Sequence, residues 1–554
     1  MGTRRDEFSL RSSRERIMDM QLGAYEADVR RRLCSWDETR FARRLWAKDP
    51  TLWFEHEEPE IVDRLGWLTL AADMAPRCSE LTAFGVEARS EGIRHVVLLG
   101  MGGSSLAPEV FQRTFGSGPG YPSLIVLDST HPDAVRAVEA AIDPAATMFV
   151  VSSKSGTTLE TLSGFRYFWS RVARVLNLPG RRFVAVTDPG TPLEDMARSR
   201  EFRAVFPAPA DVGGRYSALT MFGLVPAALV GVDLERLLDA AETMASRSGS
   251  NVTASANPGL RLGAAMGELA LAGRDKLTFL VSSTLRAFPD WMEQLVAEST
   301  GKDGKGIVPI AGEPLGDPGE YGEDRVFVSY HIDGEPAPGT DGLVAAGHPV
   351  ISISLATAYE ISAEMFRAEM ATAAAGSVLG IHPFNQPDVQ LAKTLARGAM
   401  ETEDGAAEPI EVVRPAEPGF LGSIREFLST VDTGDYIGLQ AYVPRNAENE
   451  NVLRRLRTRL RARTGAATTV GFGPRFLHST GQLHKGGANN GVFIQIVDEP
   501  SSDVPVPEVD YSFGKIIRAQ ADGDYRAMLG RDRRILRIDL GRGSLAELEQ
   551  AWPT

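Results

Sequence analysis

The chain has 554 residues, 43% of them hydrophobic and 24% charged, a composition that allows a sizeable buried core and excludes extensive disorder. A formal net charge of −14 disfavours binding to nucleic acid or to an anionic membrane. Cys34 and Cys78 are too few for a disulfide framework and lack metal-ligand spacing, so we expect no metal site. No apolar run suits a signal peptide or a membrane span, so we expect a cytoplasmic protein.

The first 90 residues and the segment that follows differ in pattern. Residues 1–90 contain amphipathic stretches such as YEADVRRRL and ARRLWAKD, which predict a helical N-terminal region. From residue 91, apolar runs such as HVVLL, SLIVL and TMFVV lead into glycine or hydroxyl residues, and helical segments separate them. This alternation predicts an α/β domain with a doubly wound parallel sheet over 91–270, whose ligand lies beyond the carboxyl ends of the strands.

The rest of the chain repeats this alternation of apolar runs and helical segments. Runs such as LTFLV, RVFVSYHI and PVISISL, followed by a long helical stretch, predict a second α/β domain over 271–400. Residues 401–419 are acidic and rich in alanine and proline, and are interpreted as a linker. Residues 420–554 predict a C-terminal α/β segment. Its basic helix NVLRRLRTRLRAR is interpreted as a solvated face, so we expect no nucleic-acid partner.

The hydroxyl-rich stretch SSKSGTT, Ser152–Thr158, follows one of these strands, and a helix is expected to begin at Leu159. Free backbone N–H groups, the helix dipole and several hydroxyls then converge on one point, which suits a phosphate dianion. Gly156 permits a close backbone approach, although the P-loop spacing is absent. A polar turn with an N-cap is the alternative, but five hydroxyls and a lysine exceed what capping needs.

The glycine-rich stretch GMGGSS, Gly100–Ser105, follows another strand. With Asp128 at the end of the next strand, it invites a dinucleotide-binding interpretation. Ser105, however, occupies the place of the third glycine in that fingerprint. We therefore expect Gly103 and Ser104 to contact a sugar or a phosphate, and we expect no redox cofactor.

Three further stretches carry residues suited to acid–base chemistry. Gln294 and Glu298 lie one helical turn apart, and Glu298 is either a general base or a solvated surface residue. Arg215 follows paired glycines in DVGGRYSALT, where a guanidinium either stabilises an oxyanion or has a structural role. Gln386 and Lys393 lie two turns apart on one predicted helical face in NQPDVQLAK.

Taken together, these segments resemble the phosphoglucose isomerase family, which has two sugar-isomerase (SIS) α/β domains, in family order over about residues 94–400. The resemblance implies that Glu298 moves a proton between C2 and C1 of an open-chain sugar and that Lys393 assists ring opening. Arg215 and the Gly214 amide would stabilise a cis-enediolate, while Gln294 and Gln386 would bind sugar hydroxyls. The sugar phosphate would be held by five residues of the hydroxyl-rich stretch: Ser153, Ser155 and Thr158, with the backbone at Lys154 and Thr157.

The chain departs from the family pattern in two places. Asn385, Asp388 and Gln390 replace the usual Asp, Gly and Glu of the last motif. The ring-opening histidine segment of bacterial relatives, similar to LHS-x-GQ, is absent between Glu298 and Lys393 and occurs instead at Leu477–Gln482. We hypothesise that the C-terminal segment is a rearranged part of the second domain that returns His478 to the active site. The alternative is that His382 opens the ring.

The resemblance implies an aldose–ketose isomerase that interconverts glucose 6-phosphate and fructose 6-phosphate and needs neither metal nor cofactor. It also implies a phosphosugar substrate, a homodimer and a likeness to the isomerase half of transaldolase–phosphoglucose isomerase fusions, although residues 1–90 are too short for a transaldolase barrel. Two alternatives stay open: a non-catalytic sugar-phosphate-binding regulatory protein, and an isomerase that also accepts mannose 6-phosphate.

Overall fold

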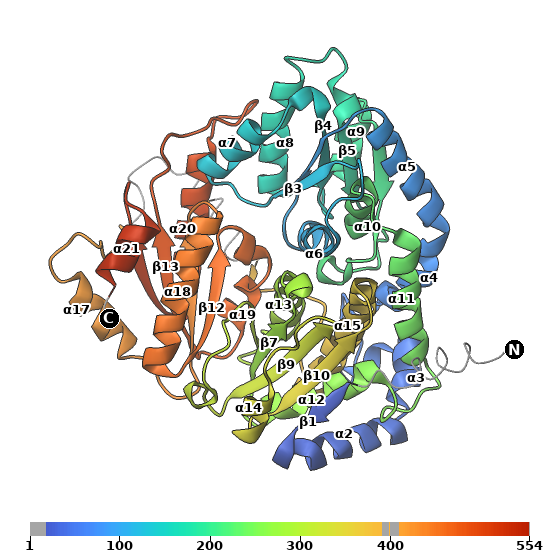
Figure 1. The fold of residues 1–554 in the computed structure, drawn as a ribbon, viewed down its shortest axis with the longest axis vertical. Helices are drawn as coiled ribbons and strands as arrows, with labels where there is room; N and C mark the ends of the chain where they lie inside the picture. Colours follow the sequence, from blue (N-terminus) through green and yellow to red (C-terminus); the bar gives the residue numbers. More distant parts are fainter. Residues whose placement is uncertain (1–17, 390–397, 399–408, 553–554) are drawn as a thin grey trace, which may run out of the picture.

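The computed structural model describes residues 18–389, 398 and 409–552, and it arranges them around three β-sheets (Figure 1). Helices α6 (Leu106–Phe115) and α13 (Phe288–Thr300) lie in the centre, between the sheets (Figure 1). Each sheet is mainly or wholly parallel and is flanked by helices, which confirms the expected α/β fold class.

The first sheet has the strand order β3-β2-β4-β5-β6, and all its strands are parallel. Helices cover both of its faces, which is why its central strands are buried almost along their whole length and carry continuous apolar runs rather than an alternating pattern. Its strands are β2 (His95–Leu99), β3 (Ser123–Leu127), β4 (Thr147–Ser152), β5 (Phe183–Thr187) and β6 (Ala204–Pro207). The helices of this part are α5 (Cys78–Ser90), α6, α7 (Pro132–Ala141), α8 (Leu159–Val172), α9 (Pro192–Ser199) and α10 (Met221–Leu229).

The second sheet has the order β1-β10-β9-β7-β8, and only β1 is antiparallel to its neighbour. Its strands are β1 (Asp19–Gln21), β7 (Lys276–Val281), β8 (Val308–Ile310), β9 (Arg325–Ile332) and β10 (Val350–Leu355). Around it lie α2 (Glu26–Glu38), α3 (Phe41–Trp46), α4 (Leu70–Met74), α11 (Leu234–Arg247), α12 (Pro258–Leu271), α13, α14 (Asp341–Ala345) and α15 (Ile361–Leu379).

The N-terminal region differs from its helical expectation at one point. Residues 19–21 form β1, which covers the free edge of β10, before the helices α2 to α5 begin. Helix α12 lies within the predicted first domain but packs tightly on α15 of the second. The helices are so close that a Cβ added at Gly263 would lie 2.7 Å from Ala371 O. The domain boundaries therefore stay a prediction.

The third sheet is formed by the C-terminal segment, with the order β12-β11-β13-β14 and all strands parallel. Its strands are β11 (Tyr436–Tyr442), β12 (Ala467–Phe472), β13 (Gly491–Val497) and β14 (Arg534–Asp539). Its helices are α17 (Phe420–Leu428), α18 (Ala447–Thr464), α19 (Gly481–Gly486), α20 (Phe513–Leu529) and α21 (Leu545–Ala551). The predicted linker 401–419 is described only from 409 onward, where Val413 pairs with Ile538 of β14.

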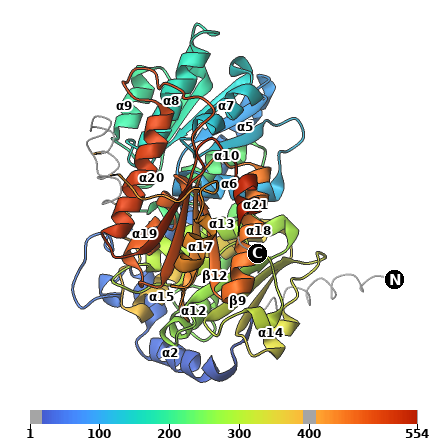
Figure 2. The ribbon, with the colours of Figure 1, turned by 90° about the vertical axis from the view of Figure 1, so that its left-hand side faces the viewer.

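The C-terminal segment packs on both other parts of the molecule. Helix α20 reaches the first part, where Phe513 contacts Tyr167 of α8 edge to face at 5.8 Å between ring centroids (Figure 2). Tyr436 and Phe493 of the third sheet share a hydrophobic cluster with Ile310 of β8. Within the described part of the chain, no helix is long and apolar enough to cross a membrane.

Candidate active site

Two of the predicted loops follow adjacent strands of the first sheet. The hydroxyl-rich loop, residues 153–158, follows β4, and a short 3-10 helix, η5 (Gly102–Ser104), follows β2, which pairs with β4. Ser152 Oγ donates a hydrogen bond to Ser104 O at 3.1 Å. Both loops therefore lie at the carboxyl edge of the sheet, where ligands of such folds bind.

The hydroxyl-rich loop has the geometry of an anion site. Ser153 Oγ and Thr158 Oγ1 lie 2.8 Å apart, as part of a hydrogen bond, and Ser155 Oγ and Thr157 Oγ1 lie 3.0 Å apart. Gly156 has φ +68°, a value that L side chains rarely adopt. Helix α8 begins at Leu159, as expected, and no described side chain caps its N-terminus. Its first N–H groups are thus available to an anion.

The side chain of Lys154 does not join the loop hydroxyls. Its Nζ forms an ion pair with Asp188 Oδ2 at 2.5 Å. Burial raises the pKa of Asp188, although Lys154 acts in the opposite direction. Only the backbone of Lys154 is left for the anion, which agrees with the role that the resemblance implies for it.

Arg215 connects three segments of the site. It lies in the 3-10 helix η8 (Gly214–Tyr216) and is buried, with its Nε donating to Ser299 Oγ at 2.7 Å. Its Nη1 donates to Gln386 Oε1 at 3.0 Å, and its Nη2 to Pro383 O at 2.8 Å. The guanidinium thereby fixes the loop that carries Gln386 against helix α13. Lys393 lies outside the described residues.

Glu298 lies between an amide and a guanidinium. Gln294 Nε2 donates to Glu298 Oε2 at 3.1 Å, as the one-turn spacing on α13 predicts, and Arg215 Nη1 lies 3.3 Å from Glu298 Oε1. The Glu298 side chain is 14% exposed, so it faces a sheltered space rather than bulk solvent. Gln294 Oε1 is buried and has no hydrogen-bond partner among the described residues, so it is free to accept a bond from a ligand hydroxyl.

The two glycine-rich stretches pack directly against each other. A Cβ added at Gly103 would lie 2.0 Å from Gly214 O, so the close contact between η5 and η8 requires glycine at position 103. Ser217 Oγ supports the same contact, since it donates to Gly214 O at 2.6 Å. The structure thus brings Gly103, Ser104 and Gly214 together.

His478 reaches the site from the C-terminal segment. It ends the 3-10 helix η12 (Arg475–His478), and its backbone carbonyl accepts a hydrogen bond from Gln294 Nε2 at 2.7 Å. A Cβ added at Gly102, which has φ +53°, would lie 2.7 Å from that carbonyl. The ring Nε2 of His478 lies 2.8 Å from Glu160 Oε1. His478 therefore lies between η5, α8 and α13.

His382 has a different environment. Its Nε2 lies 2.7 Å from Pro59 O, and its Nδ1 accepts hydrogen bonds from the backbone N–H groups of Phe384 at 3.1 Å and Asn385 at 3.3 Å. Burial lowers its pKa. Both ring nitrogens are engaged with the backbone, so His382 braces the loop before Gln386.

Asp388, one of the departures from the family pattern, has a partner in the C-terminal segment. Its backbone N–H donates to Gln482 Oε1 at 2.9 Å, and its Oδ2 accepts from Gln482 Nε2 at 2.7 Å. Gln482 is the last residue of the LHS-x-GQ segment. The unusual last motif and the displaced histidine segment are thus joined by two hydrogen bonds between Asp388 and Gln482.

Sequence reasoning missed two polar residues of the site. Glu160 follows the hydroxyl-rich stretch by two residues, but its role depends on His478, which is remote in sequence. Lys302 is buried, donates to Ser299 O at 3.1 Å and to His382 O, and has a pKa lowered well below its ordinary value by burial and by Arg215. Its place four residues after Glu298 was the available signal. Across the described residues, no group of three or more His, Cys, Asp or Glu side chains is placed to hold a metal ion.

Comparisons with known proteins identify the family of this chain. Residues 78–313 match the family model described as phosphoglucose isomerase. The chain is 31% identical over 369 residues to a glucose-6-phosphate isomerase from Rubrobacter xylanophilus, a match that covers 56% of this chain and 84% of that protein.

Solved structures show the same fold. A hypothetical protein from Thermus thermophilus matches with a TM-score of 0.58 and 24% identity, over 70% of this chain and 100% of that one. A glucose-6-phosphate isomerase from Chlamydia trachomatis matches with a TM-score of 0.52 and 22% identity, over 70% of this chain and 81% of that one. The fold and these matches indicate an isomerase with an α/β architecture. The chain belongs to the phosphoglucose isomerase family, which confirms the resemblance drawn from its motifs.

Proposed function

We infer that this enzyme interconverts glucose 6-phosphate and fructose 6-phosphate through a cis-enediolate. The observation that carries this inference is the position of Glu298 between Gln294 and Arg215, on a helix that also contacts the backbone of His478. A carboxylate beside a buried guanidinium suits proton transfer next to a carbonyl, because the cation stabilises the negative charge that develops on oxygen. A protein that only binds sugar phosphates needs no such pair.

Substrate binding is assigned to the loops at the carboxyl edge of the first sheet. The phosphate lies against Ser153, Ser155 and Thr158 and the backbone at Lys154 and Thr157, supported by the uncapped N-terminus of α8. Gly103 and Ser104 line the sugar side of this loop. Gln294, through its unpaired Oε1, and Gln386 bind sugar hydroxyls.

Ring opening is assigned to His478, with Lys393 assisting. His478 exchanges a proton with the ring oxygen or with the anomeric hydroxyl, and the carboxylate of Glu160 at 2.8 Å orients the imidazole. His382 is a poor candidate because its two ring nitrogens are engaged with backbone groups.

The chemical step then uses three groups. Glu298 removes the proton from C2 of the open-chain aldose and returns it to C1, and the reverse reaction uses the same carboxylate. As the carbonyl oxygen gains negative charge, Arg215 and the Gly214 amide donate hydrogen bonds to it. The hydroxyl proton of O2 passes to O1 of the enediolate, so atoms and charge balance within one substrate molecule and the step consumes no co-reactant.

Proton exchange measured by NMR tests this proposal. The protein is incubated in deuterated water with either hexose phosphate, with EDTA present, and we expect isomerisation with deuterium entering C2 or C1. The Glu298→Gln variant is the matched control and should bind the sugar phosphate without exchange. Binding by the wild-type protein without exchange or isomerisation would favour a regulatory protein instead.

Assembly and location rest on the family resemblance. We expect a homodimer in the cytoplasm, as implied for the family. Light scattering of the purified chain tests the first expectation, since a monomer at working concentration would contradict it. Cell fractionation tests the second.

A further inference from the structure

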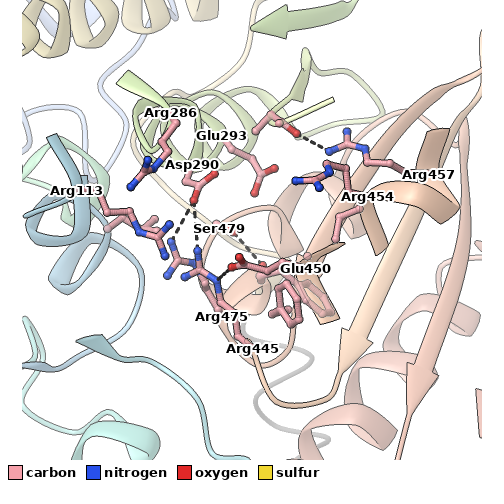
Figure 3. A pocket seen from close by; sticks show the side chains of 17 residues that line it. Arg113, Arg286, Asp290, Glu293, Arg445, Glu450, Arg454, Arg457, Arg475 and Ser479 are labelled. Carbon is pink, nitrogen blue, oxygen red and sulfur yellow. Dashed lines mark hydrogen bonds and ion pairs between the residues drawn. The ribbon is translucent and has the colours of Figure 1, made fainter. Parts of the chain in front are cut away.

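A cavity of about 300 Å³ lies where the three parts of the molecule meet (Figure 3). Its walls come from α6, α13, α18, β12 and η12, so it adjoins the catalytic elements without including Glu298 or the hydroxyl-rich loop. Asp290 and Glu293 of α13 project into it. Six arginines surround these carboxyls: Arg113, Arg286, Arg445, Arg454, Arg457 and Arg475.

Three of the six arginines neutralise buried carboxylates. Glu109 is buried and lies 2.9 Å from Arg113 Nη2, 3.0 Å from Arg445 Nη1 and 2.6 Å from Arg475 Nη1. Burial alone would raise the pKa of Glu109, but these guanidinium groups outweigh it and hold the pKa far below its ordinary value. Arg113, Arg445 and Arg475 therefore serve the packing of α6 against the C-terminal segment, through their ion pairs with Glu109.

Among the described residues, no carboxylate forms a hydrogen bond with the other three arginines. Arg457 is buried and donates only to neutral groups, to Ala311 O at 2.8 Å, to Thr468 Oγ1 at 3.2 Å and to Thr468 O. Burial lowers its pKa to about 10. Arg286 and Arg454 are exposed, and within the described ranges their side chains form neither a hydrogen bond nor an ion pair. Their positive charges therefore line the cavity, whereas the charge of Arg457 is partly offset by the nearby Glu313 and Glu293.

The acidic residues of the cavity offset these charges only weakly. Burial raises the pKa of Glu293 to about 8, and the neighbouring Asp290 adds to the effect, so Glu293 is mostly uncharged at neutral pH. Asp290 makes only long ion pairs, 3.6 Å to Arg475 and 3.8 Å to Arg445, and burial raises its pKa as well. Glu450 also lines the cavity and pairs with Arg445 at 2.8 Å, so six arginines face three acidic residues there although the whole chain is acidic.

We propose that this cavity is a second anion site, which binds a small polyvalent phosphate through Arg286, Arg454 and Arg457. Guanidinium groups present a planar pair of donors that matches phosphoryl oxygens. Arg286 lies on one side of Glu293, whereas Arg454 and Arg457 lie on the other (Figure 3). A ligand with two linked anionic groups, such as a diphosphate, spans this arrangement better than a single phosphate. The size of the cavity suits a small molecule.

Titration calorimetry with inorganic pyrophosphate, without divalent metal, tests this proposal on the full-length protein. The double variant Arg286→Ala/Arg454→Ala should bind at least tenfold more weakly than wild type. Its isomerase activity should be unchanged, which shows that it is folded. Arg463→Ala is the matched control, because Arg463 is an exposed arginine on the same helix α18 that does not line the cavity. It should bind like wild type.

The catalytic phosphate loop is the competing location for the same anion, and Ser153→Ala separates the two. If pyrophosphate occupies the arginine-lined cavity, Ser153→Ala should retain that binding. Binding that is lost in Ser153→Ala and intact in the double variant would overturn the proposal, as would no binding to the wild-type protein. Neither result bears on the proposed isomerase reaction, which is measured separately by proton exchange.

Discussion

The Nε2 atom of His478 and the Oε1 atom of Glu160 lie 2.8 Å apart, although 318 residues separate them in the sequence. Glu160 lies in the first turn of α8, directly after the hydroxyl-rich loop, and His478 lies in the C-terminal segment. The contact joins the expected phosphate site to the expected ring-opening group. It also connects two parts of the chain that form separate sheets.

We expect His478→Ala to lower turnover of the ring-form hexose phosphates by about 10²–10⁴-fold, the usual contribution of acid–base catalysis. Glu160→Gln should lower kcat by about tenfold and leave KM nearly unchanged, because a positioning carboxylate acts on the histidine rather than on substrate binding. Steady-state kinetics of both variants measures this. Gln520→Ala serves as the control, since Gln520 contacts Glu160 at 2.7 Å but not His478, and it should behave like wild type. Full turnover by His478→Ala would assign ring opening to another group.

The Glu298→Gln variant should bind fructose 6-phosphate with an affinity close to that of wild type, while kcat falls by about 10²–10⁴-fold. The amide keeps one acceptor oxygen for Arg215, and Gln294 Nε2 keeps its bond to His478 O, so proton transfer is the main loss. Calorimetric binding and kinetic assays on one preparation test this. Equal losses of affinity and turnover would show that Glu298 has a structural role.

His382→Asn tests whether this histidine is structural. The substitution removes the bonds of the ring with Pro59 O and with the Phe384 and Asn385 amides, so the free energy of unfolding should fall by about 1–3 kcal/mol. Turnover should remain at least tenfold above that of His478→Ala. Urea unfolding and activity measurements decide the matter. A lower turnover for His382→Asn than for His478→Ala would favour His382 as the ring-opening residue.

Gly103→Ala should destabilise the protein and impair catalysis, because the new Cβ would lie 2.0 Å from Gly214 O and would push η5 and η8 apart. Gly213→Ala is the matched control, with its nearest contact at an ordinary 3.7 Å to Tyr216 Cδ2, and should be tolerated. Thermal unfolding and kinetics of the pair measure the difference. Similar behaviour of the two variants would contradict the tight packing of the two glycine-rich stretches.

Replacing Glu109 with glutamine should cost about 3–5 kcal/mol of stability at pH 7, because three guanidinium groups lose the buried carboxylate that they share. The folded-state pKa of Glu109 lies below its ordinary value of 4.5. Its stabilising effect is therefore complete above pH 4.5 and is lost as the pH falls toward the folded-state pKa. The difference between wild type and variant should shrink below pH 4.5.

Urea unfolding at several pH values measures this linkage. Glu80→Gln is the control, because Glu80 is 55% exposed and pairs only with Arg77 on the surface. Its effect should be small throughout. A difference between wild type and Glu109→Gln that grows in acid would contradict the assigned ion pairs.

Much of the site was predictable because its residues stand in short local motifs. The loop before Leu159, the Gln294 and Glu298 pair and the glycines around Arg215 each follow from strand, helix and turn rules, and the structure brings them together. The position of His478 was a hypothesis drawn from a displaced motif, and the contact with Gln294 agrees with it.

Other features depend on tertiary structure that no local pattern encodes. Residues 19–21 form a strand only because β10 offers an edge, since three residues carry no periodicity of their own. The Asp388–Gln482 pair looked like a departure from a motif until the two segments were seen in contact. The arginine-lined cavity draws on three parts of the chain, and the arginines of α18 alone suggested only a solvated face.

The late position of His478 in the chain has a consequence for protein synthesis. A ribosome that adds about 5–20 residues per second releases the first sheet well before the segment with His478 emerges. The contact of α20 with α8 forms later still, since Phe513 and Gln520 follow His478. A nascent chain therefore completes the predicted phosphate loop well before it acquires the proposed ring-opening histidine, so products that stop between the two should fold in part without activity.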